Sequence, residues 1–268
     1  MNPAPIGIFD SGLGGLTVAH AIAQRLPGEC TIYFGDTARV PYGPKSAETV
    51  RRYSLEIARW LLDRGVKAIV VACNTSTAQA LDVLIEMSPV PVLGVIEPGA
   101  RAAVTVAPWH PIGVIGTAGT IRSGAYPRAI QALLPDADVV AKACPLFVPM
   151  IEEGWFNHPA TRLVAEEYLA PVRARNIRSL VLGCTHYPLI KPLIQEVIGE
   201  RVTLIDSAEE TAKAVVEAIQ KGAVEGRGGG GATHRFAVTD DPERFRRVGG
   251  GFLGEPIREV EVVSLGTA

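Results

Sequence analysis

The sequence has little that would suit it to an extracellular scaffold or to a nucleic-acid backbone. Only four of its 268 residues are cysteines, too few in a chain of this length for a disulfide scaffold. The 26 Lys and Arg residues are balanced by 28 Asp and Glu residues, so no broad basic field can hold a phosphate backbone. We therefore expect a protein of a reducing compartment whose main task is not nucleic-acid binding.

Long apolar runs and a secretory leader are also missing. The longer apolar region, 102–115, is broken by Pro108, His110 and Pro111, whereas a bilayer span needs about 20 apolar residues. The opening residues MNPAPIGIFDSG lack a basic region followed by an apolar one, as a secretory signal would have. We expect a cytoplasmic protein with no membrane association.

What the sequence does contain is a regular alternation of strand and helix patterns. Hydrophobic residues make up 47% and charged residues 20%, as in ordinary globular proteins, and the length suits one large domain or two smaller ones. Short β-branched runs alternate with helical periodicities, which predicts βαβ units and parallel sheets. The expected strands are 5–10, 31–34, 67–73, 92–96, 112–115, 138–143, 179–184 and 202–206. The expected helices are 16–26, 48–64, 76–87, 123–134, 161–175 and 188–198.

The order of elements repeats, and so do two short segments. Residues 6–12 read IGIFDSG and residues 112–119 read IGVIGTAG. Residues 69–75 read IVVACNT and residues 180–186 read LVLGCTH. This repetition predicts an α/β fold of two related, pseudo-symmetric halves that face each other.

The last part of the chain is too small to form a domain and is expected to pack on one of the halves. It contains a helical pattern at 207–222, a glycine-rich surface loop at 227–231, a strand at 235–238, a short helix that ends near 249, and a final strand at 260–264. We expect a first domain, 1–97 completed by 207–268, and a second domain, 98–206.

Two cysteines carry most of the chemical information. Cys73 and Cys184 each end a buried strand and precede a polar, helix-capping segment. Ligand sites of open α/β sheets lie outside the carboxyl ends of the strands, and a helix N-terminus there favours thiolate. Racemisation needs such a pair, because one base removes a proton from a carbon while an acid opposite delivers one to its other face.

Other uses of paired thiols fit less well. A redox pair is often CxxC, which is absent. A zinc site needs more ligands, and although His186 is close to Cys184 in sequence, no fourth ligand stands out. These residues therefore favour neither a redox pair nor a zinc site, and the resemblance described below implies that no metal or cofactor is used.

The glycine-rich turn after the first strand has two interpretations. Its sequence, Asp10-Ser11-Gly12-Leu13-Gly14-Gly15, offers N–H groups that suit a small anion. It also resembles the start of the dinucleotide fingerprint GxGxxG, with Asp36 placed as a ribose-binding acid. Thr17 stands at the third glycine position, so this fingerprint is incomplete.

Three further segments are candidates for binding or for ordinary structure. Thr117 and Thr120 could hold a carboxylate or simply cap a helix. Tyr42-Gly43 belongs to a Pro-rich loop that could be a lid or a plain surface loop. Glu152 is expected in a polar turn after Pro149.

Together the motifs closely resemble those of the bacterial glutamate racemases, in the cofactor-independent aspartate/glutamate racemase superfamily. The resemblance covers nearly the whole chain, and the tail FAVTDDPERF also fits. It rests on IGIFDSGLGGLTV, FGDTARVPYGPKS, ACNTSTA, IGTAGTIRSGAY, CPLFVPMIEEG and LGCTHYPLI.

The resemblance implies two α/β domains with the substrate between them and interconversion of L- and D-glutamate without pyridoxal phosphate or metal. D-Glutamate would feed peptidoglycan synthesis, and a homodimer is expected. Cys73 and Cys184 match the two catalytic thiols, and Asp10, His186 and Glu152 match residues that assist them. The substrate-binding matches are Asp10, Ser11, Tyr42, Gly43, Asn74, Thr75, Thr117, Thr120, Thr185 and His186.

Three alternatives stay open from the residues themselves. A sister racemase acting on aspartate or another small acid would use the same constellation. A nicotinamide oxidoreductase would use the incomplete GxG and Asp36. A non-catalytic, two-lobed amino-acid-binding protein would explain the repeat and the turns but not the twin cysteines.

Overall fold

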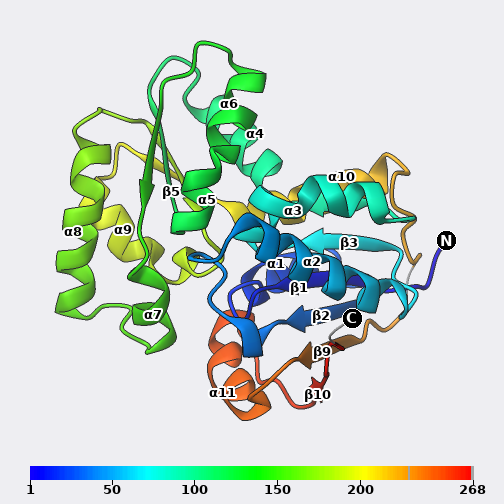
Figure 1. Ribbon diagram of the computed structural model, residues 1–268. Coiled ribbons are helices and arrows are strands. Elements are labelled where there is room, and N and C mark those ends of the chain that lie inside the picture. The colour runs from blue at the N-terminus through cyan, green and yellow to red at the C-terminus, as the bar shows by residue number, and fades with distance from the viewer. Residues whose placement is uncertain (229, 267–268) are drawn as a thin grey trace.

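The computed structural model describes residues 1–228 and 230–266, and its core consists of two separate parallel sheets (Figure 1). Gly229, in the predicted loop 227–231, and residues 267–268 lie outside the described part. No helix in the described residues is long and apolar enough to cross a bilayer.

The first sheet has six strands, all parallel to their neighbours. Its order is β10 (Glu261–Val262), β9 (His234–Val238), β2 (Thr31–Gly35), β1 (Ile6–Asp10), β3 (Ala68–Val71) and β4 (Val92–Gly94). The central strands β2, β1 and β3 are buried along their whole length, because helices cover both faces of the sheet. Because these strands are buried on both faces, their sequences consist almost entirely of apolar residues.

The second sheet repeats the arrangement of the first with four parallel strands. Its order is β6 (Val139–Ala143), β5 (Ile112–Gly116), β7 (Ser179–Gly183) and β8 (Thr203–Asp206), which matches the order β2, β1, β3, β4. The two repeated sequence segments therefore occupy equivalent strands, β1 with β5 and β3 with β7. The predicted α/β fold with two similar parallel sheets is confirmed.

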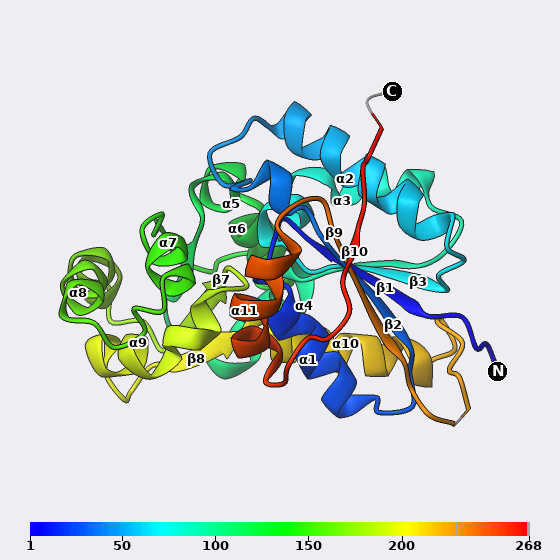
Figure 2. The same ribbon diagram turned by 90° about the horizontal axis from the view of Figure 1, so that it is seen from below.

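Helices cover both faces of each sheet. In Figure 2, α2 and α3 lie above the first sheet, α1 and α10 lie below it, and α11 packs against α1 near the end of the sheet. Helices α4 and α6 pack together beside the second sheet, and α8 and α9 pack together on its other side (Figure 1). The helices are α1 (Leu16–Arg25), α2 (Ala47–Leu62), α3 (Asn74–Met87), α4 (Ile96–Val106), α5 (Ala118–Ser123), α6 (Ala125–Leu133), α7 (Phe147–Glu152), α8 (Pro159–Arg173), α9 (Lys191–Ile198), α10 (Ser207–Gln220) and α11 (Pro242–Leu253), with 3-10 turns at Thr37–Arg39 and Tyr187–Ile190.

Four local predictions were wrong. Strand 92–96 stops at Gly94, and an unpredicted helix, α4, follows it. Helix 123–134 is two helices, α5 and α6, because Gly124 adopts a left-handed conformation with φ of 65° and ends the first. Helix 188–198 begins as a 3-10 turn. Glu152 does not lie in a turn but ends the short helix α7.

The C-terminal segment joins the first sheet. Strand β9 pairs with β2, and α10 packs against α1. A buried ion pair also contacts this segment. Lys67 Nζ lies 2.6 Å from one oxygen of Glu29, and the other oxygen accepts the backbone N–H of Arg227, in the C-terminal segment, at 2.7 Å. The side chains of Lys67 and Glu29 are 2% and 7% exposed, so neither charge has water as a substitute partner.

Replacing one member of this pair should destabilise the protein strongly. We expect Lys67→Met to lower the free energy of unfolding by about 3–5 kcal/mol, because it leaves the Glu29 carboxylate buried without its cation. Urea unfolding of this variant and of the double variant Lys67→Met/Glu29→Gln measures the effect. The double variant should recover most of the loss, and equal stability of the two would contradict the explanation.

Candidate active site

The two cysteines occupy equivalent places at the carboxyl ends of β3 and β7. Cys73 caps α3, and its sulfur accepts the backbone N–H of Ser76 at 3.4 Å and lies 3.7 Å from the Ser11 hydroxyl. Cys184 follows β7 directly. Both thiols are free and buried, with exposed fractions of 5% and 4%. Buried sulfur atoms at these strand ends match the predicted location of the site.

Asp10, at the end of the central strand β1, places a carboxyl group near Cys73. It accepts the backbone N–H of Gly12 at 2.9 Å with one oxygen, and the other oxygen has no partner among the described residues. Burial raises the pKa of Asp10, although the charge of His186 opposes this. Burial and the nearby Asp10 charge together raise the pKa of Cys73 to about 11. Cys73 is therefore held as a neutral thiol at neutral pH.

His186 gives Cys184 the opposite electrostatic surroundings. Its Nδ1 lies 3.9 Å from the Cys184 sulfur, and its Nε2 lies 3.0 Å from an oxygen of Glu152. Burial alone would lower the pKa of His186, but its bonds with Cys184 and Glu152 and their charges raise it to about 10. The imidazolium form of His186 is thus stable at neutral pH, and it places a positive charge beside the Cys184 sulfur.

A cluster of three hydroxyl groups connects the two halves. Thr75 Oγ1 lies 2.8 Å from that of Thr117 and 3.4 Å from that of Thr120. Thr117 also caps α5 by accepting the backbone N–H of Thr120 at 3.2 Å. The helix-capping interpretation of this turn is therefore confirmed, and the hydroxyls also gather at the contact between the halves, while the binding of a carboxylate there stays a prediction. A Cβ on Gly43 would lie 3.1 Å from Thr117, which places the Tyr42-Gly43 loop against the same cluster.

Asn74 is joined to the second half by a tyrosine that the sequence motifs did not single out. The Tyr126 hydroxyl donates to Asn74 Oδ1 at 2.7 Å. Burial and the neighbouring Cys184 raise the pKa of Tyr126, so its hydroxyl remains a donor. The amide nitrogen of Asn74 has no partner among the described residues and is available to a ligand.

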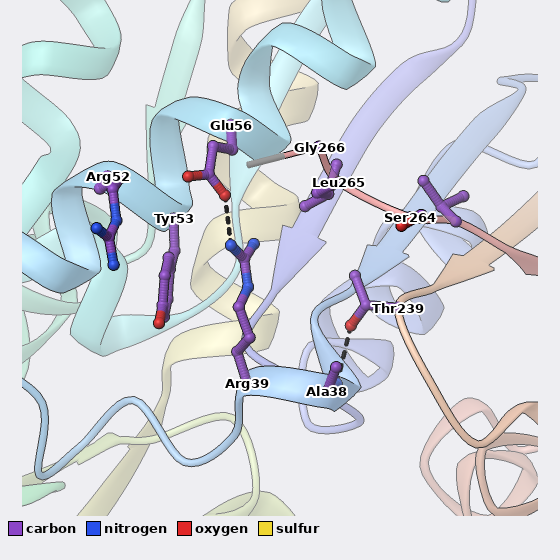
Figure 3. Close-up of a pocket in the computed structure, with 10 residues that line it drawn as sticks. Ala38, Arg39, Arg52, Tyr53, Glu56, Thr239, Ser264, Leu265 and Gly266 are labelled. Atoms are coloured by element: carbon purple, nitrogen blue, oxygen red, sulfur yellow. Dashed lines mark hydrogen bonds and ion pairs between the residues drawn. The ribbon is translucent and has the colours of Figure 1, made fainter. Parts of the chain in front are cut away.

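The Tyr42 loop is anchored by a network around Asp36. The Tyr42 hydroxyl donates to Asp36, which also accepts from Arg39 at 2.7 Å and from the Thr239 hydroxyl at 2.9 Å. Arg39 lies over the Tyr53 ring, beside a cavity of about 390 Å³ that Figure 3 shows. Because its carboxylate is fully engaged, Asp36 has no free oxygen to bind a ribose.

The glycine-rich turn is packed against the second half of the chain. A Cβ on Gly14 would overlap the Thr185 hydroxyl and the His186 ring, and one on Gly15 would overlap Asp10. The Thr17 hydroxyl also donates to the Thr185 carbonyl at 3.1 Å. These contacts fill the space that a pyrophosphate would need, so the geometry disfavours the dinucleotide interpretation at this turn. The turn's glycines permit close approach of Thr185 and His186.

Within residues 1–228 and 230–266, no cluster of three or more His, Cys, Asp or Glu side chains is arranged as a metal site.

Two residues that the sequence motifs did not single out also contact predicted site residues. Tyr126 donates to Asn74, and Arg244 donates to Glu152 at 2.9 Å. Tyr126 lies in the quoted segment IGTAGTIRSGAY and Arg244 in the tail FAVTDDPERF, but neither segment indicates a partner far away in the sequence.

An alanine at position 14 should push His186 away from the turn. We expect Gly14→Ala to lower the free energy of unfolding by about 1–3 kcal/mol, the usual range for overpacking a filled site. Gly28→Ala is the matched control, because a Cβ at Gly28 meets nothing within 4 Å. Urea unfolding compares the two variants, and equal stability would contradict the close packing of Gly14.

Comparisons with known proteins identify the family. The Asp/Glu/hydantoin racemase family profile matches residues 13–215. The glutamate racemase of Geobacter metallireducens is 55% identical over 97% of this chain and 96% of its own length. Among solved structures, glutamate racemase RacE1 of Bacillus anthracis is 40% identical with a TM-score of 0.93, covering 98% of both chains. That of Francisella tularensis, in complex with D-glutamate, is 41% identical with a TM-score of 0.92, covering 99% of both chains. The chain belongs to the Asp/Glu/hydantoin racemase family and, within it, to the glutamate racemases.

Proposed function

We propose that this chain interconverts L-glutamate and D-glutamate, with Cys73 and Cys184 as the two acid/base groups and without a cofactor. The observation that carries the proposal is the contrast between the two buried thiols. Burial and the Asp10 carboxyl group raise the pKa of Cys73, which suits this thiol to act as the acid. The Cys184 sulfur lies 3.9 Å from Nδ1 of His186, whose raised pKa keeps it protonated, and we assign Cys184 the role of the base.

The chemistry follows from this resting arrangement. The Cys184 thiolate takes the Cα proton of one enantiomer, and the Cys73 thiol gives its proton to the opposite face of the carbon. The C–H bonding pair stays on the carbon between the two transfers, and afterwards the protonation states of the thiols are exchanged. That exchanged state is the one that the reverse reaction needs. Proton exchange with water restores the first state.

Stabilising the developing negative charge is the main difficulty, because a Cα proton beside a carboxylate is weakly acidic. Fixed donors near the substrate carboxylate act on this charge most strongly where water is excluded. The hydroxyls of Thr75, Thr117 and Thr120 and the unpartnered amide nitrogen of Asn74 are such donors. We assign the binding of the substrate to them, together with Ser11, Thr185 and the Tyr42-Gly43 loop.

Glutamate is favoured over the other substrates considered. Relatives that are 55% and 52% identical to this chain carry the name glutamate racemase, and the Francisella tularensis enzyme was solved with D-glutamate. An aspartate-specific sister enzyme would use the same thiols, so turnover of the two amino acids by purified protein separates them. A binding protein without activity would give no reason for the paired cysteines and would leave the α-proton of glutamate unexchanged.

The wider setting is also proposed here. D-Glutamate made by this chain would supply peptidoglycan synthesis in the cytoplasm, and the working form would be a homodimer. We further propose that residues 1–97 with 207–268 and residues 98–206 act as two domains that hold the substrate between them. The location of β9 and β10 in the first sheet supports this division.

Removing either thiol should abolish racemisation. We expect Cys73→Ala and Cys184→Ala each to lose measurable conversion of glutamate, since each variant lacks one of the two proton carriers. Cys30→Ala is the matched control, because Cys30 is buried elsewhere and its sulfur accepts from the backbone N–H and the hydroxyl of Thr233. Circular dichroism at fixed substrate concentration follows the conversion. Full activity in either thiol variant would overturn the assignment.

Activity should also fall in alkaline solution. The raised pKa of His186, about 10, means that its proton is retained at neutral pH and lost as the pH rises through 10. The Cys73 thiol has a pKa of about 11, so it can no longer donate a proton once the pH rises above that value. We expect kcat to decline from about pH 10 upward while far-ultraviolet circular dichroism still reports a folded protein. A rate that stays constant through pH 11 would contradict these protonation states.

A further inference from the structure

The C-terminal helix α11 supplies a charged group that the proposed reaction has not yet used. Arg244 Nη2 lies 2.9 Å from Glu152 Oε2, while the other oxygen of Glu152 lies 3.0 Å from His186 Nε2. The side chains of Glu152 and His186 are 16% and 7% exposed, so water competes only weakly for their contact, whereas the Arg244 side chain is 37% exposed and keeps access to water. A continuous series of contacts thus runs from Arg244 through Glu152 and His186 to the Cys184 sulfur.

The helix that carries Arg244 is firmly held against the first sheet. Asp241 adopts a left-handed conformation, with φ of 45°, and caps the helix by accepting the backbone N–H of Arg244 at 2.9 Å. Phe245, the next residue, is buried against Tyr33 with ring centroids 5.9 Å apart. Arg244 is therefore presented from a fixed backbone.

Helix α11 contacts the His186 region at a second point. The Phe252 ring meets the His186 ring edge to face, with centroids 5.3 Å apart and an angle of 84° between the planes. Figure 2 shows α11 between the first sheet and the end of β7. Two side chains of α11 thus contact the groups next to Cys184: Arg244 contacts Glu152, and Phe252 contacts His186.

Both oxygens of Glu152 are engaged, which fixes the orientation of its carboxylate. Burial raises the pKa of Glu152, but His186 and then Arg244 outweigh it and lower that pKa, so the group stays ionised. Without the guanidinium, the carboxylate would be free to rotate away from the imidazole. The charged or titratable groups facing His186 are Cys184, Glu152 on α7 and Asp10 on β1.

We propose that Arg244 is a positioning residue for the racemisation, which holds the Glu152 carboxylate against His186 and so keeps the imidazolium directed at Cys184. This inference rests on the proposed function. Arg244 comes from the C-terminal segment of the first sheet, whereas Glu152 and His186 come from the chain around the second. The groups beside Cys184 are therefore supported by a residue from the other half of the molecule.

The test is Arg244→Gln in the full-length enzyme, with Arg246→Gln as the matched control. Arg246 lies on the same helix but pairs with Glu243, away from the thiols. We expect Arg244→Gln to lower kcat about tenfold, the effect of losing one hydrogen bond to a charged group, with KM changed less than about twofold. Arg246→Gln should match the wild type. Arg244→Lys should retain an intermediate kcat, because it keeps the charge but loses the planar fork.

A double-mutant cycle separates positioning from a general structural effect. In the Glu152→Gln background, Arg244→Gln should cause no further loss of kcat, because Arg244 acts only through Glu152. Nuclear magnetic resonance of the His186 imidazole should show a lower pKa in Arg244→Gln and an unchanged one in Arg246→Gln. This titration needs no residual activity, so it decides the question even where Glu152→Gln is too slow to measure.

The outcomes distinguish failure of this inference from failure of the proposed function. An unchanged kcat in Arg244→Gln, a loss that multiplies with that of Glu152→Gln, or an unshifted His186 titration would overturn the role of Arg244. A loss confined to KM would also overturn it, since Arg244 would then contact the substrate directly. A wild-type protein that is folded but leaves glutamate unracemised would instead overturn the proposed function itself.

Discussion

The central physical constraint is that two buried thiols need charges of opposite sign beside them. Cys73 lies near the carboxyl group of Asp10, and Cys184 lies 3.9 Å from the His186 imidazole. Water is largely excluded from both sulfur atoms, so these neighbours dominate the electrostatic surroundings of each thiol. The rest of the molecule holds these few charged groups at fixed positions in a buried place.

The fold builds this difference on a nearly symmetric scaffold. Strands β1 and β3 of the first sheet correspond to β5 and β7 of the second, so the two cysteines stand at equivalent positions. Their partners do not correspond. Gly116 occupies the position in β5 that Asp10 occupies in β1, and Thr75 occupies the place after Cys73 that His186 occupies after Cys184. Symmetry thus places the thiols at equivalent positions, and departures from it give them different charged neighbours.

The sequence was sufficient to predict the two parallel sheets and the equivalent places of Cys73 and Cys184 at strand ends, because these features leave local signals. Buried parallel strands read as apolar runs, and the repeated segments around Cys73 and Cys184 indicated equivalent places. Local signals also led to wrong predictions of secondary structure. Alpha helix α4 was missed because its apolar sequence merges into the next strand, and Glu152 was expected in a turn although it ends α7.

Contacts between distant parts of the chain could not be predicted in the same way. Arg244 lies 92 positions from Glu152, and Tyr126 lies 52 positions from Asn74. Nothing in the composition around either residue indicates its partner, because the pairing depends on how whole helices pack. The sequence drew attention to the N–H groups of the glycine-rich turn, whereas the closeness of Thr185 and His186 explains why position 14 carries no side chain.

The most direct test of two thiols acting from opposite faces is the fate of the α-proton in deuterated water. Pure D-glutamate would be incubated with the protein, and both enantiomers would be separated and analysed by mass spectrometry early in the conversion. We expect the L-glutamate formed to carry solvent deuterium at Cα while the remaining D-glutamate stays unlabelled, because one group removes the proton and another delivers the deuteron. Equal labelling of the remaining substrate and the product, or a product that retains the original proton, would contradict the account.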